Sequence, residues 1–296
     1  MELWFSPASA FALRREDNSA DNAHNMIPIA LTIAGSDSSG GAGIQADLKT
    51  FSALGVYGAS VITALTAQNT QGVSAIHAVP GAFITAQLGA VFDDLDIKAV
   101  KIGMVGSREA INAVADGLAA LRGVPVILDP VMVATSGDAL LEQSAEQALR
   151  ERLIPLADLI TPNLLEAARL LGDEKTATDE GQMRAQAARL LDFGPKAVLV
   201  KGGHGEGEEA VDILAISDTQ IRLSAPRIAT ENTHGTGCTL SSAIAAGLAK
   251  GASMEDACTG AKAYLTGALT AADALHIGQG AGPVHHFFDF WDKESS

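Results

Sequence analysis

Short apolar runs alternate with longer alanine- and leucine-rich segments from residue 27 onward. Such an alternation is typical of repeated strand, helix, strand units, which assemble a parallel sheet. The apolar runs hold few polar residues, as expected of strands that helices cover on both faces. The predicted central strands span residues 29–34, 60–65, 99–102, 125–128, 159–161 and 197–200. The pattern therefore predicts an α/β fold with a central, mainly parallel β-sheet flanked by helices on both faces.

The segments between the predicted strands carry helical periodicity. Ile44, Leu48 and Phe51 recur on one face of the first predicted helix, whereas Asp47 falls on another face. Residues 209–223 depart from the alternation of strands and helices. They contain two apolar runs around a polar turn, which predicts an antiparallel hairpin. Later helices are predicted over residues 239–249 and 254–272.

The chain is long enough for one full hydrophobic core, with 296 residues and 47% hydrophobic content. Neither an internal repeat nor a linker divides residues 27–296, so we expect a single domain there. Residues 1–26 do not fit a secretory signal, because Arg14 and Arg15 follow a short apolar stretch instead of preceding a long one. We expect residues 1–26 to form a disordered N-terminal extension.

The formal net charge of −15 at pH 7 limits the partners of this chain. An acidic surface repels nucleic-acid phosphates and anionic lipids, so we expect neither nucleic acid nor a membrane as a partner. The sequence also lacks a run of ~18 apolar residues that could span a bilayer. Its two cysteines, Cys238 and Cys258, form neither a disulfide framework nor a close zinc-binding pair. These features favour a reducing, cytoplasmic location.

A glycine-rich loop over residues 35–43 joins the first predicted strand to the first predicted helix. Glycines allow the backbone to approach a ligand, and a helix start offers unpaired N–H groups. A Walker phosphate loop is excluded because Ile44 follows the last glycine, Gly43. Residues 41–46 match a dinucleotide fingerprint, which leaves an NAD-dependent oxidoreductase open as an alternative. The other alternative is a turn that Ser39 caps.

A second glycine turn, Gly235-Thr236-Gly237, precedes the helix predicted from residue 239. Two glycines at a helix N-terminus form a nest of backbone donors that can stabilise a transferring phosphoryl group. Cys238 follows, where the helix macrodipole favours a thiolate and should lower the thiol pKa below its free value of ~8.5. The alternative is a buried structural cysteine.

Polar residues also follow three other predicted strands. Pro162 is expected to open a helix that carries Asn163 and Glu166 on one face, where an amide and a carboxylate suit a hydrated Mg²⁺ ion. The alternative is a helix cap with a solvated glutamate. Lys201 is placed to neutralise a nucleotide phosphate, and Asp129 adds a carboxylate at the same sheet edge, where open α/β sheets bind ligands.

Several of these motifs together resemble known kinases. Asn163-x-x-Glu166, Lys201-Gly-Gly and Gly235-Thr-Gly resemble the ribokinase-like superfamily. Residues 40–51, 101–104 and 234–238 are more closely similar to hydroxymethylpyrimidine and phosphomethylpyrimidine kinases of thiamine biosynthesis, in which cysteine replaces the aspartate base of the sugar kinases. The resemblance implies a ribokinase-like fold with a small β lid, a homodimer, and an ATP- and Mg²⁺-dependent enzyme. Its expected substrates are 4-amino-5-hydroxymethyl-2-methylpyrimidine and then the monophosphate of that compound.

The resemblance also implies a role for each site residue. Cys238 would accept the proton of the substrate, beside an anion hole formed by Gly235, Thr236 and Gly237. The expected metal ligands are Glu166, Asn163 and Asp129, and the expected ATP contacts are Lys201, Asn163 and Thr236. The substrate pocket would comprise Gln68, Gly35, Ala42, Met104 and Val131.

Gln68 suits that pocket because its amide offers a donor and an acceptor side by side, which matches the edge of an aminopyrimidine. Met104 and Val131 would sandwich the ring, although both could instead be core residues. A pyridoxal or pyridoxine kinase on the same fold remains an alternative, as does a binder without catalytic turnover.

Overall fold

The computed structural model describes residues 26–119, 121–132, 143–203 and 207–291. The predicted N-terminal extension therefore lies outside the described residues, except for Met26.

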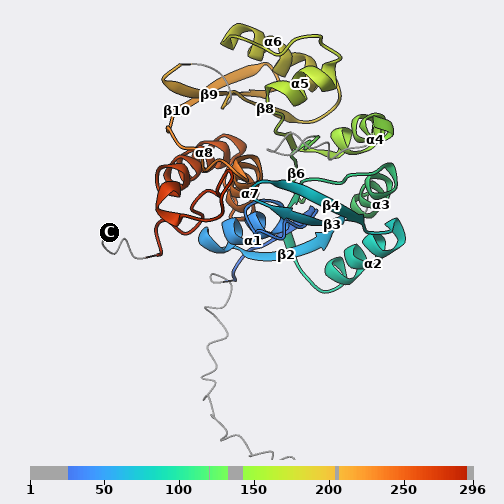
Figure 1. The fold of residues 1–296 in the computed structure, drawn as a ribbon. Helices are drawn as coiled ribbons and strands as arrows, with labels where there is room; N and C mark the ends of the chain where they lie inside the picture. The colour runs from blue at the N-terminus through green and yellow to red at the C-terminus, as the bar shows by residue number, and fades with distance from the viewer. Residues whose placement is uncertain (1–25, 120, 133–142, 204–206, 292–296) are drawn as a thin grey trace, which may run out of the picture.

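Within the described residues, eight strands form one sheet in the order β10-β9-β8-β7-β6-β5-β1-β2 (Figure 1). From β2 to β8 neighbouring strands run parallel, while β9 runs antiparallel to both β8 and β10. This confirms the predicted mainly parallel sheet and the predicted hairpin. The strands are β1 (Ile29–Ala34), β2 (Tyr57–Ile62), β5 (Ile97–Ile102), β6 (Val126–Leu128), β7 (Leu159–Ile160), β8 (Ala197–Lys201), β9 (Glu209–Ile216) and β10 (Thr219–Pro226).

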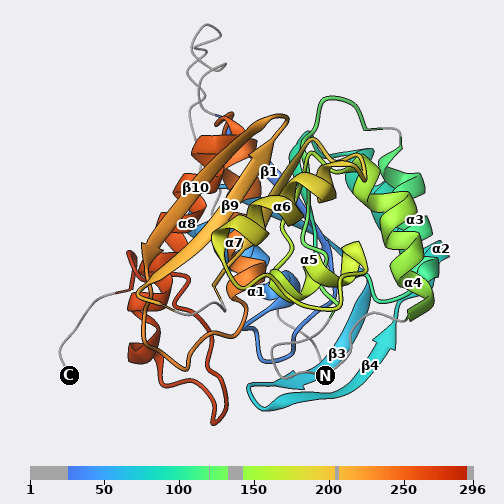
Figure 2. The same cartoon turned by 90° about the horizontal axis from the view of Figure 1, so that it is seen from above.

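Helices cover both faces of the sheet (Figure 2). The side chains of β1 alternate between the two cores: Leu31 and Ile33 join one buried cluster, and Ala30 joins the other. The cluster of Ala30 is covered by α1 (Gly43–Ala53), α7 (Thr236–Ala249) and α8 (Met254–Thr270). The opposite cluster is covered by α2 (Gly81–Phe92), α3 (Arg108–Leu118), α4 (Gln143–Ala148), α5 (Leu164–Leu171) and α6 (Glu180–Leu191). Short helical turns complete the fold at η2 (Leu149–Leu153), η3 (Ile154–Leu156) and η4 (Ala272–Leu275).

A separate two-stranded hairpin, β3 (Ala64–Asn69) and β4 (Gly72–Ala78), lies along one margin of the molecule (Figure 2). It is the small β element that the family resemblance implies. The strand predicted over residues 60–65 is wrong in its bounds, because β2 ends at Ile62 and the chain then leaves the main sheet to pair with β4. The apolar run continues through this break, so the sequence pattern does not reveal it.

The parallel strands end together at one edge of the sheet, and α7 begins beside that edge. The predicted helix at residue 239 in fact starts three residues earlier, at Thr236. No helix in the described part of the chain is both long and apolar enough to cross a membrane.

Candidate active site

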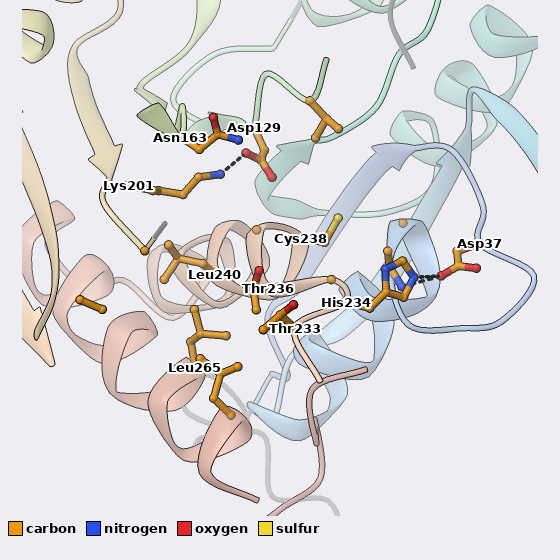
Figure 3. A pocket seen from close by; sticks show the side chains of 18 of the residues that line it. Asp37, Asp129, Asn163, Lys201, Thr233, His234, Thr236, Cys238, Leu240 and Leu265 are labelled. Carbon is orange, nitrogen blue, oxygen red and sulfur yellow. Dashed lines mark hydrogen bonds and ion pairs between the residues drawn. The ribbon is translucent and has the colours of Figure 1, made fainter. Parts of the chain in front are cut away.

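The structure brings all the predicted site residues to one cavity of about 390 Å³ (Figure 3). This cavity lies where the carboxyl ends of β1, β5, β6 and β8 meet the N-terminus of α7. The predicted residues that line it are Gly35, Ala42, Gln68, Met104, Asp129, Val131, Asn163, Glu166, Lys201, Gly235, Thr236, Gly237 and Cys238.

The N-terminus of α7 lines this cavity with backbone N–H groups. Gly235 caps the helix with φ +81°, and a Cβ atom there would lie 1.9 Å from the carbonyl oxygen of Gly41, so only glycine fits. The first helical hydrogen bond runs from Thr239 N to Gly235 O at 2.8 Å. The N–H groups of Gly237 and Cys238 come before this bond, so they have no hydrogen-bond partner within the helix. They lie at the positive end of the helix macrodipole.

The loop over residues 35–43 has a different role from the one the sequence suggested. The Asp37 carboxylate accepts hydrogen bonds from the backbone N–H groups of Ser39 at 2.9 Å, Gly41 at 3.1 Å and Ala42 at 2.8 Å. These donors are therefore not free for a phosphate or a dinucleotide. The alternative of a turn that Ser39 caps is also wrong, since the Ser39 hydroxyl donates to Asp37 Oδ1 at 2.7 Å and Asp37 accepts the backbone donors of the turn.

Asp37 also ties this loop to the segment before α7. Its Oδ2 lies 2.8 Å from His234 Nε2, and both side chains are buried (Figure 3). Burial alone would raise the pKa of Asp37, but its contacts with His234 and Ser39 outweigh burial and lower that pKa to about 2. Neither residue was predicted to have a role, although an aspartate in a Ser- and Gly-rich turn is a known sign of side-chain-to-backbone bonding.

A buried ion pair links the ends of β6 and β8. Lys201 Nζ lies 2.7 Å from Asp129 Oδ1, which also accepts a 3.1 Å hydrogen bond from Thr161 Oγ1. Burial would raise the pKa of Asp129, but the charges of Lys201 and Lys101 outweigh it and lower that pKa. Burial would likewise lower the pKa of Lys201, yet Asp129 and Glu166 raise it. The pair therefore stays charged within the cavity.

Asn163 and Glu166 form a capping box at the start of α5. Asn163 Oδ1 accepts from Glu166 N at 2.9 Å, and Glu166 Oε2 accepts from Asn163 N at 2.8 Å. The helix thus begins after Asn163, and the prediction that Pro162 opens it is wrong. Glu166 is buried, so the alternative of a solvated glutamate is also wrong. Burial raises the pKa of Glu166 to about 7, against the lowering effect of Lys201.

Cys238 lies in the first turn of α7, between the Lys201–Asp129 pair and the Asp37–His234 pair in the view of Figure 3. The Gly43 backbone N–H, at the start of α1, helps to lower the pKa of this thiol. Burial nevertheless raises the pKa of Cys238 to about 11, although the charge of Lys101 lowers it. The expectation of a lowered pKa is therefore wrong, because desolvation of the thiolate outweighs the helix N-terminus.

A second ion pair, which was not predicted from the sequence, lies under this helix turn. Lys101 Nζ bonds both carboxylate oxygens of Asp47 at 2.9 Å, and both side chains are 0% exposed. Thr32 and Ser242 each donate a 2.6 Å hydrogen bond to the same carboxylate. The placement of Asp47 away from the packed face of α1 was wrong, because the partners that make its burial possible come from β1, β5 and α7.

The wall near β3 contains the predicted substrate residues. A Cβ atom at Gly35 would lie 2.3 Å from Met104 Cε, so the missing side chain makes room for the methionine. Val131 follows β6, and Gln68 lies within β3, where Thr66 Oγ1 contacts its amide at 3.1 Å. This end of the cavity has apolar walls and one polar edge.

The opposite end of the cavity, between β10 and α8, is mostly apolar and was not predicted. Leu240 and Leu265 lie there in Figure 3, away from Cys238 and the Asp37–His234 pair. An ion pair lies beside them: Lys262 Nζ bonds Asp212 Oδ2 at 2.7 Å. The cavity thus has an apolar end, a charged centre and a second end near Gln68.

Comparison with known proteins agrees with this layout. The family model described as Phosphomethylpyrimidine kinase matches residues 37–285. A hydroxymethylpyrimidine/phosphomethylpyrimidine kinase of Rhizobium meliloti is 62% identical over 266 residues, which cover 90% of this chain and 99% of the relative.

Solved structures show the same fold. The phosphomethylpyrimidine kinase of Clostridium difficile aligns with a TM-score of 0.72 and 46% identity, covering 81% of this chain and 98% of that one. The pyridoxal kinase of Bacillus subtilis, in an ADP complex, aligns with a TM-score of 0.81 and 38% identity, covering 88% and 98%. Because the family model and the relative match nearly the whole described fold, the chain belongs to the phosphomethylpyrimidine kinase family.

Proposed function

We propose that this chain transfers the γ-phosphoryl group of ATP to the hydroxymethyl oxygen of 4-amino-5-hydroxymethyl-2-methylpyrimidine, and then to the phosphate of the product. One observation carries the proposal: the unpaired N–H groups of Gly237 and Cys238 face the same cavity as Lys201 and the polar edge at Gln68. The higher identity to the pyrimidine kinases favours this function over that of a pyridoxal kinase. Membership of a kinase family likewise excludes the NAD-dependent oxidoreductase.

The nucleotide would lie along the apolar end and the charged centre. Leu240, Leu265 and the neighbouring apolar residues suit a nucleobase, and Lys201 suits its phosphates. Thr236 and Asn163 also line the cavity and would contact the nucleotide. The γ-phosphoryl group would then reach the N-terminus of α7, where fixed donors stabilise the charge of the transition state.

The carboxylates around Lys201 suit a divalent cation. Glu166 is buried with a pKa of about 7, so its negative charge is poorly compensated by the protein alone. The described residues hold no group of three or more His, Cys, Asp or Glu side chains that could enclose a metal. We therefore propose a Mg²⁺ ion that Glu166, Asp129 and Asn163 hold together with water and phosphate oxygens. When bound, the ion would neutralise phosphate charge.

Cys238 is the proposed acceptor of the hydroxymethyl proton. Its thiol is neutral in the resting site because its pKa is about 11. The base form is therefore a minor species at neutral pH, but it is a strong base once formed. Lys101 lies close enough to lower that pKa, although Asp47 and Asp129 raise it, so the Lys101 ammonium is the charge that favours the base form.

The substrate would bind with its ring between Met104 and Val131, near Gly35 and Ala42, and with its amino edge at Gln68. This arrangement would hold the hydroxymethyl group toward Cys238 and the α7 N-terminus, so that positioning supplies a large part of the catalysis.

Mass spectrometry of reaction products tests the proposed function. The purified protein is incubated with MgATP and, separately, with the hydroxymethylpyrimidine, its monophosphate, pyridoxal and ribose. We expect a monophosphate from the first substrate and a diphosphate from the second. Phosphorylation of pyridoxal or ribose alone would contradict the proposal.

We further propose a cytoplasmic homodimer. Large apolar side chains are exposed around the β3–β4 hairpin and α2: Leu65 is 47%, Ile76 48% and Phe83 62% accessible to solvent. An isolated two-stranded sheet is marginally stable and gains from a partner surface. Ultracentrifugation should show a dimer for the native chain and a monomer for Ile76→Glu. A monomeric native chain would contradict the assembly but not the activity.

A further inference from the structure

Four polar side chains form a chain of contacts from the glycine-rich loop to the substrate end of the cavity. Asp37 Oδ2 lies 2.8 Å from His234 Nε2, which lies 3.5 Å from one end of the Gln68 amide. The other end of that amide lies 3.1 Å from Thr66 Oγ1. Asp37, His234 and Thr66 are buried, while Gln68 is partly open to the cavity.

Asp37 determines which ring nitrogen of His234 carries a proton. Besides His234, its carboxylate contacts only donors: the N–H groups of Ser39, Gly41 and Ala42 and the Ser39 hydroxyl. A carboxylate that receives this many donors is an ionised acceptor, in keeping with its lowered pKa. His234 Nε2 must therefore be protonated. Because its one proton is directed at Asp37, this nitrogen presents Gln68 with the edge of an N–H group and has no lone pair that could accept a hydrogen bond from the amide.

Thr66 imposes the complementary demand at the other end of the amide. Its hydroxyl lies 2.8 Å from the Ser36 carbonyl oxygen, which can only accept. The single hydroxyl proton is thus committed to Ser36 O, and the Thr66 oxygen offers Gln68 an acceptor. Both neighbours call for the same orientation of the amide, with its NH₂ group toward Thr66 and its oxygen toward His234.

The structure has Gln68 Nε2 on the His234 side, 3.5 Å from a ring nitrogen that cannot accept a hydrogen bond. A half-turn of the amide exchanges its oxygen and nitrogen, which have nearly the same shape, and gives every donor an acceptor. We propose that Asp37, through His234, acts with Thr66 to fix the Gln68 amide in this orientation, and that the fixed amide makes the site select a 4-aminopyrimidine over a 4-oxopyrimidine. The inference rests on the proposed function for the identity of the substrate.

The two pyrimidines require opposite orientations of the Gln68 amide. A 4-aminopyrimidine presents a ring-nitrogen acceptor beside an amino donor, whereas the 4-oxo compound presents an N–H donor beside an oxygen acceptor. If the amide could turn freely, it would pair with either edge at little cost. A fixed amide leaves the 4-oxo edge with two mismatched contacts, which a closed site penalises strongly.

Calorimetry tests this without relying on turnover. The dissociation constants of 5-hydroxymethyl-2-methylpyrimidine in its 4-amino and 4-oxo forms are measured for the native protein, Thr66→Val and His234→Phe. Thr66→Val removes the acceptor of the amide NH₂ group, and His234→Phe removes the polar N–H edge that favours the amide oxygen, so each should lower the preference for the 4-amino form roughly tenfold. Ser39→Ala is the matched control: it removes a 2.7 Å contact to Asp37 Oδ1 but leaves the Asp37–His234 contact, and should keep the native preference.

The outcomes separate the inference from the proposed function. A native preference that survives in both Thr66→Val and His234→Phe, or a native protein without preference, overturns the inference even if the enzyme phosphorylates the pyrimidine. A preference that falls in these variants supports the inference even if no product forms. If His234→Phe fails to fold, Thr66→Val alone decides, since valine keeps the shape of the buried threonine.

Discussion

Lys201 Nζ lies 2.7 Å from Asp129 Oδ1, and this buried contact joins the ends of two strands that are separated by β7 in the sheet. The pair brings a cation to the centre of the cavity, beside the first turn of α7. A Cβ atom on Gly237 would lie 3.3 Å from Lys201 Nζ and 3.4 Å from Asp129 Oδ2. The geometry of the proposed phosphoryl site therefore depends on this pair.

We expect Lys201→Met to abolish turnover and to destabilise the fold by ~3–5 kcal/mol, because it leaves Asp129 buried without its partner. Lys196→Met is the matched control: Lys196 pairs with Asp158 at 2.5 Å on the surface, and its loss should cost less than ~1 kcal/mol. The double variant Lys201→Met/Asp129→Asn should recover most of the stability but none of the activity. Urea unfolding and a coupled ATPase assay measure both quantities, and a double variant with native turnover would remove Lys201 from the mechanism.

Gly235→Ala should disable the anion hole. Gly235 has a φ of +81°, and the added Cβ would lie 1.9 Å from the carbonyl oxygen of Gly41. The loop would therefore have to move. Gly251 has a similar φ of +87° but open space around its Cβ position, so Gly251→Ala carries only the conformational cost of ~1 kcal/mol. We expect Gly251→Ala to keep native turnover and Gly235→Ala to lose it. Equal turnover in the two variants would show that the loop geometry is unimportant.

Gln68→Leu should weaken binding of the aminopyrimidine by ~1–3 kcal/mol, because it leaves the polar edge of the ring unpaired in a closed pocket. Binding of ATP at the other end of the cavity should change little. Separate titrations with the two ligands measure these effects. Unchanged catalytic efficiency with the aminopyrimidine would remove Gln68 from the substrate site.

Glu166 should make stability fall as pH rises. Its pKa is raised from 4.5 to about 7 in the folded protein, so the folded state holds a proton that the unfolded state has already released. The stability linked to this group is therefore complete below about pH 4.5 and is lost as pH rises to about 7. Glu166→Gln keeps a capping oxygen but cannot ionise, so it should gain stability relative to the native chain between about pH 5 and pH 8.

The same variant tests the proposed metal site. An amide binds a hard cation less well than a carboxylate, so Glu166→Gln should raise the Mg²⁺ concentration needed for the half-maximal rate. An unchanged Mg²⁺ titration together with an unchanged pH dependence of unfolding would mean that Glu166 is neither a ligand nor an ionising group.

Much of the layout follows from local patterns in the sequence. β1 and β8 were predicted because they are short, nearly continuous apolar runs. The carboxyl ends of parallel strands necessarily meet at one edge. This geometric rule brought Asp129 and Lys201 together although they are 72 residues apart. The residue pattern alone did not locate the β3–β4 hairpin, which only the family resemblance implied, because its first strand continues an apolar run. In its turn the Asn69 side chain accepts from Gln71 N and Gly72 N.

The features that the sequence did not reveal depend on partners distant along the chain. Asp37 and His234 are 197 residues apart, and Ser242 reaches Asp47 across 195 residues. A local pattern cannot show which buried donors will surround such a carboxylate. The pKa of Cys238 was predicted in the wrong direction for the same reason, because desolvation depends on how β1, β5 and α7 pack together.

The most direct test of the proposed reaction is the pH dependence of kcat/KM for the aminopyrimidine, measured in the native enzyme and in Cys238→Ser. The value of kcat/KM reports ionisations of the free enzyme, and the thiol has a pKa of about 11 there. The native kcat/KM should therefore keep rising with pH beyond ~8.5, the usual pKa of a free thiol, where a typical cysteine would level off. Cys238→Ser should melt at nearly the native temperature, turn over ~10²–10⁴-fold more slowly, and lose this rising limb. Undiminished turnover in Cys238→Ser, with the rising limb intact, would contradict the assignment of Cys238 as the base.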